Sequence, residues 1–202
     1  VCEGPEGVGF ISGGSGIAKM VNLDNDQIRK LVNKMAELED IADVIIIDTG
    51  AGIAPSVMEF LVASPEILLV TTPEPTSITD SYALLKALSM NEDFDKNVTS
   101  IKMIANKVSS EMEGRRVYEK LSVVVTKFLN LEIGFIGTVP HDKDITKAIT
   151  KQKPVSIMYP NSIAARHYQN IVNTLESHVD NITYSKYRGI KGCIKTIFAN
   201  RK

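Results

Sequence analysis

The chain has 202 residues and a formal net charge of −1. This length suits one globular domain with a sizeable core, and no apolar run approaches the roughly 20 residues of a membrane-spanning helix. Its two cysteines, Cys2 and Cys193, form no metal-binding or redox motif, which is typical of unpaired thiols in a reducing cytosol. We therefore expect a cytoplasmic protein that does not depend on a disulfide.

Charge is unevenly distributed along the chain. Residues 1–180 carry a net charge of −7, whereas residues 181–202 contain six basic residues and no acidic one. An acidic body is a poor surface for the phosphate backbone of DNA, so we expect no direct DNA binding. A basic tail suits an acidic partner surface such as anionic lipid. We therefore divide the chain into a domain at 1–181 and a tail at 182–202.

Apolar periodicity predicts alternating strands and helices. Strands are expected at residues 8–12, 43–48, 66–71, 99–106 and 132–139. Helices are expected near residues 25–38, 53–61, 77–88, 110–128, 143–151 and 161–178. Ser110 and Glu113 form a capping box at the start of one of these helices. Strands separated by such helices imply right-handed βαβ crossovers, so we predict an α/β fold, a three-layer α/β/α sandwich with a mainly parallel sheet.

The run DVIIIDTGAG at residues 43–52 carries the clearest chemistry. Residues 44–47 are apolar and β-branched, which predicts a strand buried on both faces. Asp48 then lies at the carboxyl end of that strand, where open α/β sheets bind ligands. Gly50 and Gly52 let the backbone approach a ligand closely. In P-loop NTPases an acid at this place holds Mg²⁺, yet the chain contains no G-x-x-x-x-G-K-[ST] phosphate loop.

The order of these signals resembles the MinD/ParA family of deviant-Walker ATPases, and within it the branch that controls flagellar number. The strings that carry the resemblance are EGP at 3–5, SGI at 15–17, IDTGAGI at 47–53, TPEPTSITDSYALLK at 72–86, NK at 106–107 and GTVPHD at 137–142. The resemblance covers essentially the whole chain. The long string at 72–86 is specific, whereas each short string alone is weak.

The resemblance implies roles for particular residues. Asp48 would be the catalytic Walker B acid that holds Mg²⁺ through water, and the backbone N–H of Gly50 would donate to the γ-phosphate. Asn106 would read the adenine edge, because an amide can both donate and accept hydrogen bonds. Pro140 and Asp142 would belong to the loop that walls the base, with a helix N-cap as the alternative role for Asp142.

The family's own phosphate loop, K-G-G-x-G-K-[ST], is absent from the chain. Phosphoryl transfer depends on that cradle, so we expect this chain alone to be a poor ATPase. The resemblance also implies a central first strand before Val1. Each buried backbone group left without its ladder partner would cost ~1–3 kcal/mol, and we expect the chain to be a fragment.

The tail resembles a membrane-targeting helix. The residues predicted to contact the membrane are Tyr187, Ile190, Lys191, Ile194, Lys195, Ile197 and Phe198. Apolar members recur at helical spacing and basic members occupy another side, which is typical of a helix that lies in a membrane interface. Gly189 and Gly192 would weaken this helix in water. A helix packed on the body is the alternative.

Together these features imply a MinD-like ATPase, with ATP and Mg²⁺ as cofactors, that controls flagellar number and placement. It would form an ATP-dependent homodimer, bind the anionic inner face of the cell membrane from the cytoplasm, and contact flagellar assembly proteins. Two alternatives stay open. One is a MinD-type septum-site ATPase, against which the string at 72–86 weighs. The other is a non-catalytic interaction protein that has lost its phosphate loop.

Overall fold

The computed structural model describes residues 2–11, 38 and 41–179, and the chain divides into two compact units, Val1–Ile46 and Ile47–Lys202. In the first unit, β1 (Cys2–Glu3) pairs antiparallel with β2 (Gly9–Phe10) across the short helix η1 (Pro5–Gly7). The prediction of a strand at 8–12 in a parallel sheet is wrong here. The tight turn at η1 folds the chain straight back on β1, and β2 spans only Gly9–Phe10.

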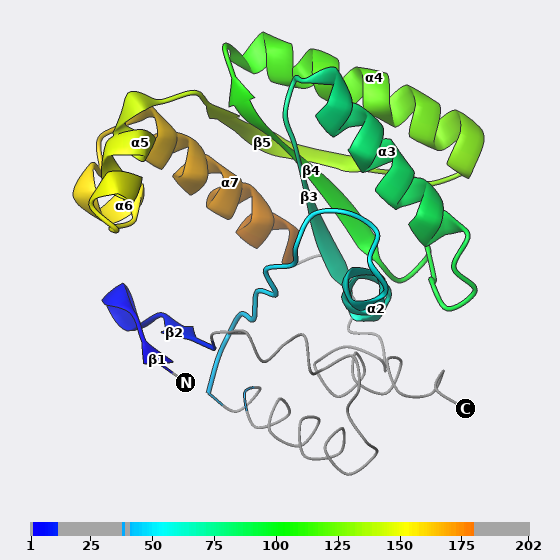
Figure 1. Cartoon of the computed structure of the whole chain (residues 1–202), viewed down its shortest axis with the longest axis horizontal. Helices are drawn as coiled ribbons and strands as arrows, with labels where there is room; N and C mark the ends of the chain where they lie inside the picture. Colours follow the sequence, from blue (N-terminus) through cyan, green and yellow to red (C-terminus); the bar gives the residue numbers. More distant parts are fainter. Residues whose placement is uncertain (1, 12–37, 39–40, 180–202) are drawn as a thin grey trace. The chain divides into compact units, whose positions relative to one another are not determined.

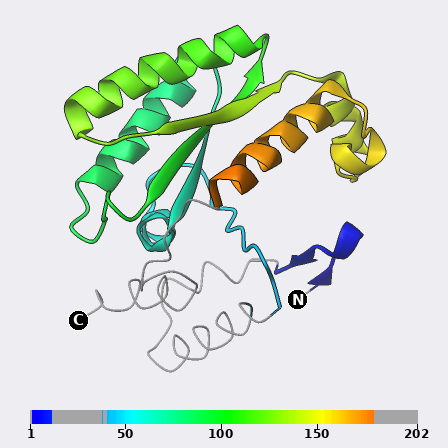
Figure 2. The same ribbon diagram turned by 180° about the vertical axis from the view of Figure 1, so that it is seen from behind.

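The second unit contains a parallel sheet in the order β3-β4-β5. Its strands are β3 (Glu66–Thr71), β4 (Ser100–Val108) and β5 (Gly134–Pro140), and its main helices are α3 (Pro75–Ser89), α4 (Glu111–Leu129) and α7 (Ile163–Val179). Helices α3 and α4 cover one face of the sheet, and α7 lies on the other face (Figure 1, Figure 2). The predicted three-layer α/β/α fold with a parallel sheet is confirmed.

Three shorter helices complete this unit: α2 (Pro55–Ala63), α5 (Lys143–Thr150) and α6 (Val155–Met158). The helix predicted at 25–38 lies outside the described residues except for residue 38. The predicted membrane tail lies wholly outside them. Where the structure does describe helices, none has both the length and the apolar character needed to cross a membrane.

The core follows from the alternation of side chains along β4. Ile101, Met103 and Ala105 point to one face of the sheet and are buried with α3 and α4. The largest fully buried side chains of this cluster include Leu85, Leu88, Leu121 and Val125. A smaller cluster on the opposite face packs β5 against α7 through Ile136, Val139 and Ile171.

Two glycines permit helices to lie close to the sheet. A Cβ added at Gly114 of α4 would collide with Cγ2 of Thr138 and lie 3.1 Å from Cβ of Ala105. Gly137 interrupts the regular register of β5 with a φ of 153°, and an added Cβ there would lie 2.8 Å from Cγ1 of Ile171. These contacts bring α4 and α7 close to opposite faces of β5.

The strand predicted at 43–48 is not formed, which corrects the sequence analysis. Residues 44–50 have no regular structure, and Val44 and Ile46 are 76% and 78% exposed. A run of β-branched residues becomes a buried strand only when a neighbouring strand satisfies its backbone groups. No described segment pairs with these residues, because the parallel sheet consists of β3, β4 and β5 alone.

Candidate nucleotide-binding site

The carboxyl edge of the parallel sheet gathers the ends of β3, β4 and β5, where ligands of open α/β sheets bind. Asn106 of β4 lies opposite Val139, and Val108 lies opposite Pro140. The backbone N–H of His141 donates to the carbonyl oxygen of Val108 at 2.9 Å. The structure thereby brings Asn106 beside the loop that begins at Pro140, two elements that the sequence analysis assigned to one base site.

The end of β4 holds the amide of Asn106 in a defined orientation. The ladder between β4 and β5 shifts register between Asn106 and Val108, and the intervening Lys107 has a left-handed φ of 55°. The backbone N–H of Lys107 donates to Oδ1 of Asn106 at 2.9 Å. This bond leaves the two Nδ2 hydrogens and one further lone pair of Oδ1 for other partners. A half-buried amide presented in this way can both donate to and accept from a ligand.

Asp142 is the N-cap of α5. Its Oδ1 accepts from the N–H of Asp144 at 2.8 Å, and its Oδ2 accepts from the N–H of Ala164 at 3.0 Å. These two donors hold the pKa of the Asp142 carboxyl below its usual value, with nearby Lys143 and Lys147 adding to the effect. Asp142 therefore joins the start of α5 to the start of α7, and its carboxylate has a structural role in this loop.

Sequence reasoning gave no binding role to two carboxylates at this edge: Glu74, whose charge interacts with that of Lys107, and Glu113, whose charge interacts with that of Glu74. Glu74 follows β3, and its pKa is lowered by a hydrogen bond from the Thr72 side chain, by its own backbone N–H and by the charge of Lys107. Glu113 accepts from the N–H and Oγ of Ser109 at 2.6 and 2.8 Å, and these bonds lower its pKa. The sequence signal that could have found Glu74 and Glu113 is their position, because each lies in or beside a segment that follows a predicted strand.

Neither Asp48 nor Gly50 follows a strand in the described part of the chain. Both are exposed and belong to the irregular segment that precedes α2. A Cβ at Gly50 would meet nothing within 4 Å, and Gly52 has a left-handed φ of 99°. Within the described ranges, no group of three or more His, Cys, Asp or Glu side chains could hold a metal ion. A lone carboxylate such as Asp48 still fits Mg²⁺, which proteins commonly hold through one or two carboxylates together with substrate phosphates.

Comparison with known proteins identifies relatives, although no family model matches the chain. The antiactivator FleN of Pseudomonas aeruginosa is 37% identical over 174 residues, which cover 86% of this chain and 61% of FleN. The flagellum site-determining protein YlxH of Helicobacter pylori is 31% identical over 183 residues, or 89% of this chain and 60% of YlxH. The chain thus spans about 60% of the length of these relatives.

The fold is similar to a solved structure of the cell division ATPase MinD of Pyrococcus furiosus, with a TM-score of 0.57 and 20% identity. That match covers 77% of this chain and 62% of the MinD chain. The chain is thus similar in sequence to FleN and YlxH and similar in fold to MinD. The predicted resemblance to the MinD/ParA family, and within it to the FlhG (YlxH) type, is confirmed.

Proposed function

We propose that this chain is part of a MinD-like ATPase that controls flagellar number and placement through ATP-dependent dimerisation and membrane association. The observation that carries the proposal is the carboxyl edge of the sheet, where Asn106 lies beside the loop from Pro140 to Asp142. The similarity to the antiactivator FleN and to a flagellum site-determining protein supports the flagellar role. The partners would be a second copy, anionic lipid at the inner face of the cell membrane, and flagellar assembly proteins.

In this proposal each site residue has a distinct task. The amide of Asn106 would hydrogen-bond the adenine edge, and the backbone from Pro140 to Asp142 would wall the base. The carboxylate of Asp48 would orient the metal-bound water, and the N–H of Gly50 would donate to the γ-phosphate. Mg²⁺, when bound, would neutralise charge on the phosphates during transfer.

The proposal also accounts for two exposed apolar surfaces. Within the described part of the chain, β3 pairs with β4 and has no strand along its other edge, and its Val70 is 55% exposed. Val44 and Ile46 are exposed as well. In the complete protein, the strand and helix of the phosphate loop would pack on these surfaces. Such a strand would give residues 44–47 the neighbour that they lack.

The decisive experiment uses the protein with its upstream segment restored. We expect Mg-ATP to drive dimerisation, measured by light scattering, and Asp48→Ala to abolish phosphate release by removing metal positioning. Asp43→Ala, which changes another exposed acid of the same segment, is the control and should hydrolyse ATP normally. Unchanged turnover in Asp48→Ala would contradict the Walker B assignment.

Membrane association is tested separately by co-sedimentation with anionic vesicles. The double variant Ile194→Glu and Phe198→Glu places charges on the predicted apolar side and should lose binding. Thr196→Glu and Asn200→Glu add the same charge on the other side of the predicted helix and should retain more binding. Wild-type binding by the first double variant would show that the tail is not the anchor.

A further inference from the structure

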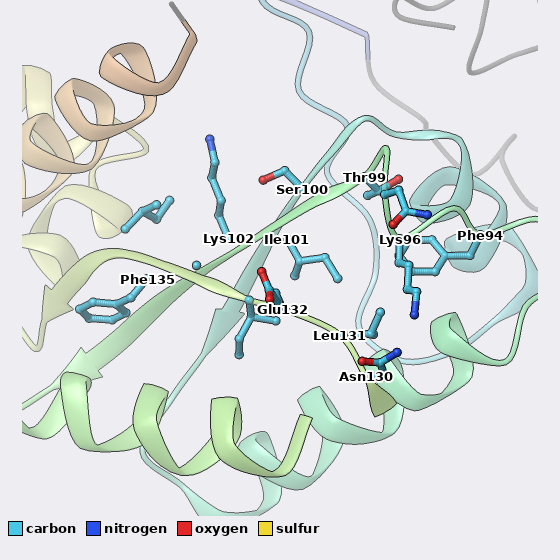
Figure 3. Close-up of a pocket in the computed structure, with 14 residues that line it drawn as sticks. Phe94, Lys96, Thr99, Ser100, Ile101, Lys102, Asn130, Leu131, Glu132 and Phe135 are labelled. Atoms are coloured by element: carbon cyan, nitrogen blue, oxygen red, sulfur yellow. The ribbon is translucent and has the colours of Figure 1, made fainter. Parts of the chain in front are cut away.

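Two adjoining hollows lie at the amino edge of the sheet, opposite the candidate nucleotide site. The larger, of about 640 Å³, is lined by the first residues of β4 and β5 and by the segments before them (Figure 3). The smaller, of about 460 Å³, lies along the loop between α3 and β4. Both are lined by Phe94, Lys96, Asn97 and Leu131, so they form one continuous surface that we call the amino-edge groove.

Helix α7 leads the chain to this groove. Its contacts with β5, taken along the helix, are His167 with Thr138, Ile171 with Gly137, and Leu175 with the cluster around Ile136. Residue numbers rise along the helix while they fall along the strand, so α7 runs antiparallel to β5. The next residues of β5 in this direction, Phe135 and Gly134, line the larger hollow. Helix α7 therefore runs toward the amino-edge groove.

The groove and the tail have complementary chemistry. The half-buried Phe94 and Phe135 supply apolar surface in the groove. The carboxylates that line it are those of Glu92, Asp93, Asp95 and Glu132, all on exposed residues. Lys102, one of its two lysines, already pairs with Glu66 at 2.8 Å. The segment after residue 180 has six basic residues, no acidic residue, and apolar residues at helical spacing.

We propose that residues 184–202 dock in the amino-edge groove when the protein is not at a membrane. The five residue steps from Val179 to residue 184 can span at most ~18 Å, which restricts the start of the tail to surfaces near the end of α7. Because the tail is tethered, its effective concentration at the groove is of order mM, and a weak contact suffices. The regulatory meaning rests on the proposed membrane role. The same apolar side chains would enter either the groove or the lipid, so the groove would hold the tail off the membrane.

The two native cysteines provide the test on the 202-residue chain without lipid. Cys193 lies within the tail, and the exposed Cys2 serves as an internal reference. If the docked state is favoured about tenfold, Cys193 is alkylated about tenfold more slowly than in a synthetic peptide of residues 184–202. Equal rates in chain and peptide would overturn the proposal. Protection that rises with protein concentration would point to a second copy as the partner and would overturn it too.

Charge reversal identifies the surface that protects Cys193. The double variant Glu92→Lys and Glu132→Lys should restore fast alkylation. Asp80→Lys and Glu119→Lys make the same charge change at exposed sites on α3 and α4 and should keep the protection. All four positions are exposed, and unfolding midpoints show whether either variant loses its fold. Equal protection in the two double variants would place the tail elsewhere and refute the groove.

A second measurement does not depend on charge variants. In a Cys2→Ser background, Asn97→Cys in the groove should cross-link to Cys193 under mild oxidation, whereas Glu119→Cys on α4 should not. Cross-linking at both positions, or at neither, would contradict docking at this site.

Vesicle binding separates this proposal from the proposed function. If both hold, the groove variant binds anionic vesicles several-fold more tightly than the wild type, because its tail is no longer held. Protection of Cys193 with no vesicle binding would refute the membrane role and retain the docking. Vesicle binding with an unprotected Cys193 would refute the docking and retain the membrane role.

Discussion

Asn106 and Lys107 show how a strand end can prepare a binding group before any ligand arrives. The left-handed φ of Lys107 is uncommon for a residue other than glycine. It turns the N–H of Lys107 toward Oδ1 of its neighbour Asn106. An amide already held in one orientation loses less freedom on binding than a mobile one does. Under the proposed function, Asn106 is therefore the residue at this edge whose removal should affect nucleotide recognition most directly.

We expect Asn106→Ala to weaken ATP binding by ~1–3 kcal/mol, because the base loses its hydrogen-bond partners. Calorimetry on the protein with its upstream segment restored measures this change. Asn97→Ala, an exposed asparagine at the opposite edge of the sheet, is the control and should bind ATP normally. Unaltered affinity in Asn106→Ala would reduce Asn106 to a turn residue.

Asp142 supports a prediction about stability. Asp142→Ala removes the N-cap of α5 together with the bond to Ala164, and should lower the free energy of unfolding by about 1 kcal/mol. The pKa of Asp142 is lowered in the folded state, so its contribution is present above the pKa of the unfolded chain. The contribution disappears as the pH falls through the lowered folded pKa.

The measurement for Asp142 is urea unfolding of wild type and Asp142→Ala at neutral and acidic pH. The difference between the two proteins should shrink in acid. Glu119→Ala, on the exposed face of α4, should differ little from wild type at either pH. A difference for Asp142→Ala that does not change with pH would show that the carboxylate charge is unimportant to the cap.

Hydrogen bonds between residues close in the chain were predictable from the sequence, whereas those between distant residues were not. The capping box was visible because Ser110 and Glu113 are close in the chain, and Oγ of Ser110 does accept from the N–H of Glu113 at 3.2 Å. The side chain of Glu113, however, bonds Ser109 rather than the backbone of Ser110. The hydrogen bond from the N–H of Ala164 to Oδ2 of Asp142 joins two helices, and no sequence pattern predicts it.

At the scale of elements, strands were predictable where their partners are present. The apolar runs that became β3, β4 and β5 lie between helices that cover the sheet, and their predicted bounds nearly match those observed. Residues 44–47 have an equally strong pattern and form no strand. The difference is tertiary, because a β pattern describes side chains suited to burial and does not supply the neighbouring strand.

The contact between α4 and β5 gives a prediction at this scale. Gly114→Ala should lower the free energy of unfolding by ~1–3 kcal/mol, because the new methyl group collides with Cγ2 of Thr138 and the packing must shift. Thr138→Ser removes that methyl group and keeps the hydroxyl that lies 3.2 Å from Nδ1 of His167. The double variant should therefore recover part of the loss. Recovery would be incomplete, because the added Cβ would also lie 3.1 Å from Cβ of Ala105.

Thermal unfolding of the two single variants and the double variant completes this cycle. Gly134→Ala is the matched control, since an added Cβ there would meet only the carbonyl oxygen of Ile101 at 3.8 Å, an ordinary contact. Additive effects of Gly114→Ala and Thr138→Ser would show that the predicted collision does not determine how closely α4 packs.

At the scale of the whole molecule, helices cover one face of the parallel sheet more completely than the other. Helices α3 and α4 bury the side chains of β3 and β4 that point toward them. On the other face α7 packs against β5, while Leu68 and Val70 of β3 are 38% and 55% exposed. Apolar residues on an edge strand are a recognised aggregation hazard when nothing covers them. Under the proposed function, the upstream segment with the phosphate loop would cover these residues.

This asymmetry predicts that one substitution has different effects in the two forms of the protein. In the 202-residue chain, Val70→Lys introduces a charge at a site open to water, and the free energy of unfolding should change by no more than about 0.5 kcal/mol. In the protein with its upstream segment restored, the same lysine would be buried beneath the added elements without a partner. There it should cost ~2 kcal/mol or more.

Urea unfolding of both forms measures the contrast, with Val123→Lys as the matched control. Val123 is 65% exposed on α4, away from the open face, so the control should have a small effect in both forms. Equal effects of Val70→Lys in the two forms would mean that the upstream segment does not cover β3. The phosphate loop could not then occupy the place that the proposed function gives it, and Asp48 and Asn106 would lack the cradle that phosphoryl transfer requires.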